Sequence, residues 1–253
     1  MRRSDHSPGG PPSRRAVLLT AGGLAAAGGG FAAGFGVAHA AGGAGDADSP
    51  AVLRVPTPGE DLMTEHGLLI RVLLVYRDLM AGQAAGQPVQ AGHAHDAALI
   101  IHDYIEAFHE ELEEAYVFPR LIQAGRLRPT VSTLLLQHAR GRELTQLILA
   151  GSGGSGSLPA VAADQVTSAM AAFVRMYEPH EAREDTVVYP AYRALLTPAE
   201  IADLGARFAD LQTQQFGGDG FTAMVGRVAA IEQALGIYDL AQFTPPNITP
   251  PPA

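Results

Sequence analysis

Residues 109–119 and 180–190 share a short pattern of side chains that can bind a metal. Their sequences, HEELEEAYVFP and HEAREDTVVYP, place a glutamate four residues after a histidine, add a second acid, and end in an aromatic residue and a proline. Residues four apart share one face of a helix, so His109 pairs with Glu113 and His180 with Glu184. Two such pairs on facing helices can form a metal site in the core of a helical bundle.

Two further histidines fall on apolar stripes that are expected to face inward on other helices. His66 lies on the stripe of a helix expected over residues 57–80, and His138 on that of a helix over residues 130–149. A single histidine on such a stripe is more often a core residue than a ligand. Four histidines on four helices, two of them followed by a glutamate, are much harder to explain as chance.

Burying Glu113 and Glu184 near the axis of a bundle is costly unless a cation or a metal compensates their charge. We therefore predict a metal cluster. The alternative is a metal-free core in which both glutamates pair with Arg142 and with histidines. His102, which lies seven residues before His109, is predicted to be a core or outer-sphere residue, too far along the helix to share the same metal.

The composition limits both the metal and the partners. The chain has no cysteine, so a transition metal must be held by imidazole and carboxylate groups, which suits iron, manganese or zinc. All basic residues are arginine, which excludes lysine-based Schiff-base chemistry. The formal net charge is −9, which makes nucleic acid or an anionic membrane a poor partner.

The periodicity of apolar residues predicts an all-α fold. Four helices, over residues 57–80, 95–118, 130–149 and 166–191, favour an antiparallel up-down four-helix bundle spanning residues 57–196. Two more helices, over residues 197–216 and 221–235, are expected to form a C-terminal helical hairpin (residues 197–236) that covers the bundle. Thr-Pro-x-Glu at Thr57 and at Thr197 predicts a capped helix start at each position.

Regular helical spacing also predicts which residues point inward near each glutamate. After Glu113 these are Ala115 or Tyr116, and after Glu184 they are Val187 and Ala191. Pro179 is expected to kink the fourth helix just before His180.

The two ends of the chain are predicted to lie outside the bundle. Residues 13–19 (SRRAVLL), followed by an uncharged Ala/Gly-rich run, resemble a twin-arginine export signal over residues 1–40, with cleavage after Ala40. An uncleaved membrane anchor is the alternative, because the uncharged run is long enough to span a bilayer. Residues 41–56 are predicted to be a disordered tether, and residues 237–253 a Pro-rich tail.

Over residues 57–196 the chain resembles the hemerythrin family of cation-binding proteins. The resemblance rests on the doubled His-x-x-x-Glu motif with its trailing aromatic residue and proline, on EHGLL around His66 and on QHARGREL around His138. It implies a four-helix bundle that holds two iron ions bridged by carboxylate and oxo or hydroxo groups. The metal ligands that it implies are His66, His109, Glu110, Glu113, His138, His180 and Glu184.

The chain departs from the oxygen-carrying members of that family at two positions. They place a second histidine one turn after the third-helix ligand, where this chain has Arg142, and this chain instead offers Glu110 directly after His109. More carboxylate ligands favour Fe(III), which argues against reversible oxygen carriage. Arg142 is predicted to tune the site or to bind an anion or peroxide. Asp185 is an alternative ligand to Glu184, which lies closer to the face of His180.

These observations predict an exported, periplasmic or extracellular di-iron protein that binds or senses oxygen, peroxide, nitric oxide or redox state. The twin-arginine translocase is the expected partner during export, and no stable membrane anchor is expected after cleavage. Non-enzymatic binding is the first interpretation. The alternatives are a di-iron oxidase or peroxidase that relays electrons through Tyr76, Tyr104 or Tyr177, and a metal-poor bundle that serves interactions.

Overall fold

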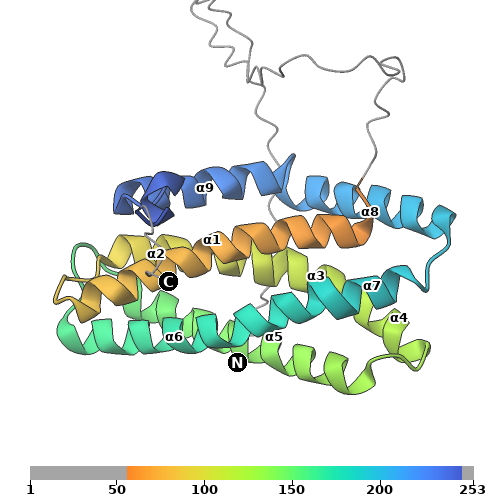
Figure 1. Cartoon of the computed structure of the whole chain (residues 1–253), viewed down its shortest axis with the longest axis horizontal. Coiled ribbons are helices and arrows are strands. Elements are labelled where there is room, and N and C mark those ends of the chain that lie inside the picture. The colour runs from red at the N-terminus through yellow and green to blue at the C-terminus, as the bar shows by residue number, and fades with distance from the viewer. Residues whose placement is uncertain (1–55, 247–253) are drawn as a thin grey trace, which may run out of the picture. The chain divides into compact units, whose positions relative to one another are not determined.

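A computed structural model describes residues 56–246, in which helices joined by short loops are the regular secondary structure and no β-strand occurs (Figure 1). Its only strand-like pairing is an isolated bridge between Gln90 and Ser157. The all-α prediction is confirmed. The export signal, almost all of the tether and the last residues of the tail lie outside the described residues. None of the described helices is both long and apolar enough to cross a membrane.

The first helix, α1 (Pro58–Ala84), begins where its sequence predicts and ends about one turn later than expected. Thr57 caps it by accepting a hydrogen bond from the Glu60 amide, and the Glu60 carboxylate accepts one from the Thr57 amide. These two bonds satisfy amides that have no partner within the helix. His66 is buried, as its place on the predicted apolar stripe requires, whereas Ile70 one turn later is exposed.

A continuous helical run follows, and it begins about one turn earlier than predicted. Its segments alternate between α-helix and the wider π-helix: α2 (Ala91–Ile100), η1 (Ile101–His109), α3 (Glu110–Leu112), η2 (Glu113–Val117) and α4 (Phe118–Gln123).

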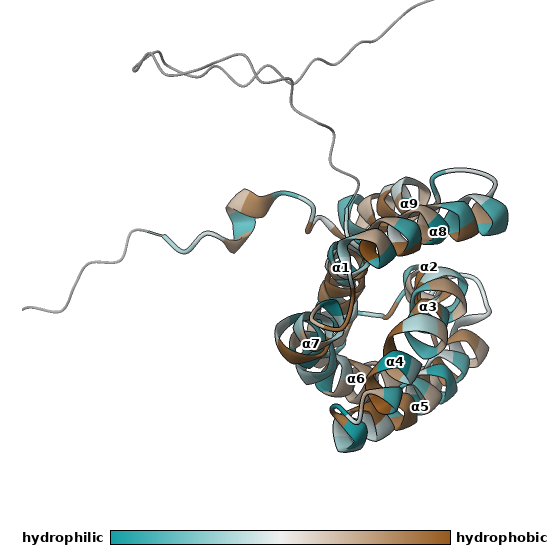
Figure 2. Ribbon diagram, turned by 90° about the vertical axis from the view of Figure 1, so that its right-hand side faces the viewer, coloured by the Kyte–Doolittle hydropathy of each residue, from teal (hydrophilic) through white to brown (hydrophobic). Residues whose placement is uncertain are grey.

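The third and fourth helical stretches supply the remaining walls of the core. They comprise α5 (Arg128–Ser152), α6 (Ala160–Arg183), η3 (Glu184–Val188) and α7 (Tyr189–Arg193). Helix α1 packs on α6, α6 on α5, α5 on α2, and α2 on α1. These helices therefore surround one buried interior, which Figure 2 shows nearly end-on.

Each copy of the repeated motif contains a π-helical turn that begins at its glutamate. The Phe118 amide donates to the Glu113 carbonyl, and the Tyr189 amide donates to the Glu184 carbonyl, in both cases across five residues. The proline that follows each aromatic residue has no N–H and crowds the carbonyl four residues back, which the wider turn accommodates. The shared proline thus accounts for the shared distortion.

The π turns shift the buried face by one residue, so the predicted inward residues beyond each glutamate were wrong. Val117 and Phe118 are buried in place of Ala115 and Tyr116, and Val188 and Tyr189 are buried in place of Val187 and Ala191. Regular spacing of 3.6 residues per turn cannot anticipate this shift. Its effect is to turn Phe118 and Tyr189 toward the interior.

The two C-terminal helices, α8 (Pro198–Phe216) and α9 (Gly220–Leu235), do not form the predicted hairpin. They lie nearly end to end along α1 and the α2–α4 run (Figure 1). The two helices run antiparallel to the α2–α4 run, as three contacts show: Glu200 binds Arg120, Gln212 binds Tyr104, and Arg227 binds Asp103. Gly217, in the left-handed conformation, ends α8 without reversing the chain. A short 3-10 helix, η4 (Leu240–Phe243), follows in the predicted tail.

Candidate metal centre

Six of the predicted ligands converge in the interior, and each has at most 3% of its surface exposed. Helices α1 and α5 each supply one histidine, His66 and His138. The two repeated motifs supply the other four residues, which are His109, Glu113, His180 and Glu184. Ligand atoms of Glu113, His138, His180 and Glu184 lie within 4.8 Å of one another, as do those of His66, His109 and Glu113. This buried cluster can hold a metal ion.

The four histidines form two pairs that face each other through their Nε2 atoms. Nε2 of His66 lies 3.1 Å from Nε2 of His109, and Nε2 of His138 lies 3.3 Å from Nε2 of His180. Each pair combines one histidine of a repeated motif with one from α1 or α5. Four imidazole nitrogens therefore point into one small buried space.

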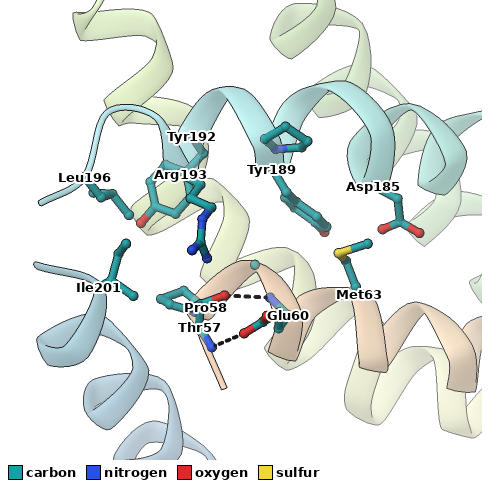
Figure 3. Close-up of a pocket in the computed structure, with 12 residues that line it drawn as sticks. Thr57, Pro58, Glu60, Met63, Asp185, Tyr189, Tyr192, Arg193, Leu196 and Ile201 are labelled. Carbon is teal, nitrogen blue, oxygen red and sulfur yellow. Dashed lines mark hydrogen bonds between the residues drawn. The ribbon is translucent and has the colours of Figure 1, made fainter. Parts of the chain in front are cut away.

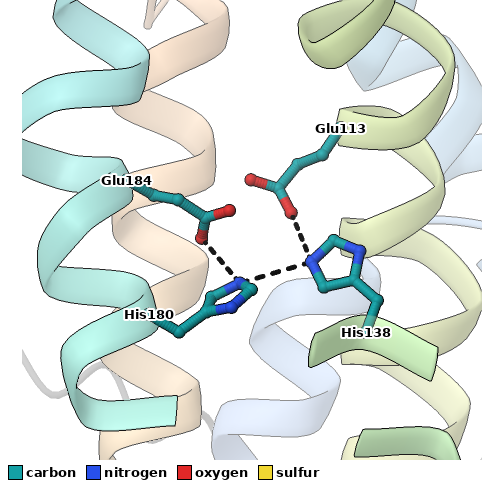
Figure 4. Close-up of side chains that lie close together, drawn as sticks. All are labelled: Glu113, His138, His180 and Glu184. Atoms are coloured by element: carbon teal, nitrogen blue, oxygen red, sulfur yellow. Dashed lines mark hydrogen bonds and ion pairs between the residues drawn. The ribbon is translucent and has the colours of Figure 1, made fainter. Parts of the chain in front are cut away.

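The two glutamates lie between the histidine pairs. Oε2 of Glu184 is 3.4 Å from Nε2 of His66 and 3.1 Å from Nε2 of His180. Oε2 of Glu113 is 3.4 Å from Nε2 of His138 and 3.7 Å from Nε2 of His109. Figure 4 shows the half that contains His138 and His180. Each carboxylate thus contacts one histidine of each pair.

Three of the four carboxylate oxygens in the cluster accept no hydrogen bond. These are both oxygens of Glu184 and Oε2 of Glu113, whereas Oε1 of Glu113 accepts one from the Tyr189 hydroxyl at 2.7 Å. Buried carboxylate oxygens without a donor are rare, because their desolvation is not compensated. Their nearest charged neighbours are the imidazole nitrogens, so a cation between them satisfies both ligand types.

The charges of the metal-free cluster are set by its carboxylates. Burial disfavours the charged form of His66, but its bond to Asp185 and its contact with Glu184 outweigh this and raise its pKa to about 10. Burial likewise opposes the charged form of His138, and its contacts with Glu113 and Glu114 still raise its pKa to about 10. Burial raises the pKa of Glu184, but His180 and His66 outweigh it and lower that pKa. Without a metal, His66 and His138 therefore carry a proton on both ring nitrogens at neutral pH.

A second layer of polar groups orients all four imidazole rings. Every Nδ1 atom donates to an outer acceptor: His66 to Asp185 (2.7 Å), His109 to Glu65 (2.8 Å), His138 to Glu114 (3.0 Å) and His180 to Gln137 (3.0 Å). These bonds fix each ring so that its Nε2 atom points inward, as outer partners of metal-bound histidines do.

Sequence reasoning did not assign these four acceptors, although two signals for them were present. Glu114 and Asp185 are the second acids of the repeated motifs, and Glu65 and Gln137 each directly precede a predicted histidine ligand. The structure brings Glu184 into the cluster and leaves Asp185 as the acceptor for His66. The prediction that His102 is a core or outer-sphere residue was wrong, since 46% of its side chain is exposed and its Nδ1 atom lies 3.0 Å from Asp103, which is not part of the cluster.

Glu110 and Arg142 lie beside the cluster and contact each other. Oε1 of Glu110 accepts a hydrogen bond from the Tyr177 hydroxyl at 2.6 Å, and its Oε2 lies 2.8 Å from Arg142. Arg142 also bonds to Glu114 at 2.7 Å. Burial raises the pKa of Glu110 to about 7, although His138, Tyr177 and Arg142 lower it.

Glu110 approaches only the outward Nδ1 atom of His138, at 4.0 Å. Glu110, Glu114 and His138 form a third group of possible ligands, but both of its carboxylates already pair with the Arg142 guanidinium. The predicted roles of Glu110 as a ligand and of Arg142 as an anion binder stay predictions.

Several pockets border the cluster or the outer partners of its histidines. A pocket of about 260 Å³ between the start of α1 and α7 is lined mainly by apolar side chains and is bounded by Asp185 and Tyr189, the neighbours of His66 (Figure 3). The Tyr189 ring lies 5.6 Å from the His66 ring, in a stacked orientation. A pocket of about 230 Å³ on the other side is lined by His180 itself, together with Gln137 and Arg183. The second pocket therefore borders a cluster histidine directly, whereas the first borders only the neighbours of His66.

Three mycobacterial proteins are similar to this chain along most of its length. Rv1995 and MT2051 of Mycobacterium tuberculosis and Mb2018 of Mycobacterium bovis are each 46% identical to it over 204 residues, which is 80% of this chain and 80% of the relative. All three bear the name "uncharacterized protein". No family model matches the chain, and no solved structure gives a significant match.

Proposed function

We propose that this chain, which belongs to the family of the uncharacterized mycobacterial protein Rv1995, is a di-iron protein of the hemerythrin type. In this proposal an antiparallel four-helix bundle, made of α1, the α2–α4 run, α5 and α6–α7, holds two iron ions in the buried cluster. The observation that carries it is the pair of glutamates lying between two facing pairs of imidazole Nε2 atoms. His66 and His109 would bind one iron, His138 and His180 the other, and Glu113 and Glu184 would bridge them.

The spacing of the ligand atoms fits metal coordination. Bonds of about 2.1 Å at tetrahedral or octahedral angles separate neighbouring ligand atoms by roughly 3.0 to 3.4 Å. The Nε2–Nε2 distances of 3.1 and 3.3 Å meet this requirement, and so do the Oε2–Nε2 distances of 3.1 to 3.4 Å. Only the contact between Glu113 and His109 is longer, at 3.7 Å.

Iron is proposed from the ligand chemistry together with the resemblance to hemerythrins. Imidazole and carboxylate groups without thiolates suit iron, manganese or zinc. A twin-arginine signal would export the protein after folding, so the metal could be loaded in the cytoplasm before copper or zinc outside compete for the site. Two bound irons supply a redox-active pair that can interact with oxygen, peroxide or nitric oxide.

The surrounding residues would admit and orient such a small ligand. The apolar pocket ending at Tyr189 suits an uncharged diatomic molecule, and the Tyr189 hydroxyl already donates a hydrogen bond to Glu113 beside the His66 ring. All four imidazoles are held by outer acceptors, so the cluster is organised before a metal or ligand arrives.

Metal analysis of the full chain, expressed with iron supplied and combined with absorption spectroscopy, tests the proposal. We expect close to two irons per chain, and loss of most of them in the His109→Ala and His180→Ala variants. His102→Ala is the matched control, because His102 lies on the same helical run as His109 but is exposed. Less than one metal per chain, unchanged in the two cluster variants, would refute the proposal and favour a metal-poor bundle.

A di-iron oxidase or peroxidase is the second candidate, and one hydrogen-bonded chain favours it. The Tyr104 hydroxyl donates to Oε1 of Glu65 at 2.8 Å, and Oε2 of Glu65 accepts from Nδ1 of His109. Tyr104 is thereby linked to a candidate ligand, whereas the Tyr76 hydroxyl has no hydrogen-bond partner. Catalytic consumption of peroxide with a reductant, diminished in Tyr104→Phe, would favour the enzyme, and a stable adduct without turnover would favour the binding protein.

A further inference from the structure

The cluster repeats itself about an approximate twofold relation. Half A contains His66 and His109, and half B contains His138 and His180. In each half, the histidine supplied by α1 or α5 is held by the acid that follows the glutamate of the other half's motif: Asp185 binds His66, and Glu114 binds His138.

The residue that directly precedes each histidine supplied by α1 or α5 completes the repeat. Glu65, before His66, binds Nδ1 of His109, and Gln137, before His138, binds Nδ1 of His180. The two halves thus have the same architecture, and differences between corresponding residues become informative.

The first difference lies in the acceptor for the motif histidine. In half A this acceptor is a carboxylate, Glu65, which is 4% exposed and is fixed by the Tyr104 hydroxyl. In half B it is the neutral amide of Gln137. An ionised acceptor on the Nδ1–H group makes the opposite nitrogen a stronger donor to a metal than an amide acceptor does. Half A is therefore expected to bind a cation more tightly.

The second difference between the halves also favours cation binding in half A. In half B, Arg142 lies 2.7 Å from Glu114 and 2.8 Å from Glu110, so one guanidinium offsets part of the negative charge there. Among the described residues, no arginine forms an ion pair with Glu65 or Asp185 in half A. The electrostatic attraction for a cation is thus larger in half A on two independent counts.

We infer that the two metal positions are unequal and that a divalent cation fills half A before half B. The difference between the carboxylate acceptor Glu65 in half A and the amide acceptor Gln137 in half B determines this order. The inference rests on the proposed metal-binding function. Glu65 acts through His109, so it is a positioning residue rather than a ligand. Replacing an outer-sphere partner of this kind changes metal affinity by about 10–100-fold.

Stepwise titration of the metal-free, full-length protein with Co²⁺ under argon, followed by calorimetry and visible absorption, tests the inference. Two isosteric variants form a matched pair. Glu65→Gln should weaken the first binding step by about 10–100-fold and leave the second step nearly unchanged, whereas Gln137→Glu should strengthen the second step by a similar factor. Circular dichroism and melting temperature verify that both variants fold.

If the two halves bound the cation equally well, or if half B bound it first, the two variants would give the opposite pattern. Glu65→Gln would then weaken only the second step, because the first ion would enter the unaltered half, and Gln137→Glu would strengthen the first step. That outcome refutes the inference while two bound ions still support the proposed function. Absence of Co²⁺ binding in the unaltered protein would overturn both.

Discussion

Replacing Gly141 by alanine tests a close contact between α5 and α6, next to the cluster. Gly141 is buried in the middle of α5, and a Cβ atom there would lie 2.0 Å from the Tyr177 hydroxyl and 2.8 Å from two carbons of its ring. Real Cβ atoms essentially never come so close to another atom, so Tyr177 or the α5 backbone must move. Tyr177 is itself buried against Phe173 and hydrogen-bonded to Glu110.

Three contributions set the expected loss of stability. Overpacking of a core costs about 1–3 kcal/mol. Losing a buried hydrogen bond to a charged group costs about 1.5–3 kcal/mol. The better helix propensity of alanine returns up to about 1 kcal/mol. The free energy of unfolding should therefore fall by about 2–4 kcal/mol.

Urea unfolding of the full chain in the presence of a chelator measures this change without a contribution from bound metal. Gly67→Ala is the matched control: Gly67 is exposed in the middle of α1, and its added Cβ would have no neighbour within 4 Å. That variant should be as stable as the unaltered protein or up to about 1 kcal/mol more stable. Truncating the ring in Gly141→Ala/Tyr177→Ala should cost less than the sum of the single changes. If Gly141→Ala is as stable as Gly67→Ala, the close packing of Gly141 on Tyr177 does not exist in solution.

Three further predictions concern protons and metal. Because the pKa values of His66 and His138 are near 10 without metal, metal uptake at pH 7 should release protons, and the apparent affinity should rise as the pH increases toward 10; calorimetry in buffers of different ionisation enthalpy measures both effects. Removing metal with a chelator should lower the melting temperature, and an unchanged value would contradict binding to the folded state alone. Burial, then the charges of Glu65 and Glu60, raise the pKa of Asp61 from 3.8 to about 6, so its ionisation lowers the stability of the fold as the pH rises between these two values. Asp61→Asn should therefore add roughly 1 kcal/mol near pH 7, after allowance for solvent screening, and little near pH 4, as urea unfolding at both pH values can verify.

Much of the helical content could be predicted because helix starts and apolar spacing are local properties. The capping sequences at Thr57 and Thr197 mark two starts correctly, since the groups that satisfy the free amides lie within four residues. The end-to-end arrangement of α8 and α9 could not be predicted in this way. It depends on contacts with distant residues, such as that of Glu232 with Arg71.

The buried face beyond each glutamate shows where local periodicity fails. Pro119 and Pro190 were visible in the sequence, but a proline can end, kink or widen a helix. Here each widens the helix by one residue, and this brings Tyr189 against His66 and Phe118 against His138. Packing around the cluster selects that outcome, and packing is not a local property.

The sequence by itself determined which side chains are available for chemistry: four histidines on four helical stretches, two of them paired with glutamates, and no cysteine. Helical geometry alone places each His-x-x-x-Glu pair on one face. Only the tertiary structure decided that His66 faces His109 and that His138 faces His180, because these pairings join different helices. It also decided that Glu65 and Gln137 hold the rings, since a hydrogen bond over 2.8–3.0 Å requires a defined position of both partners.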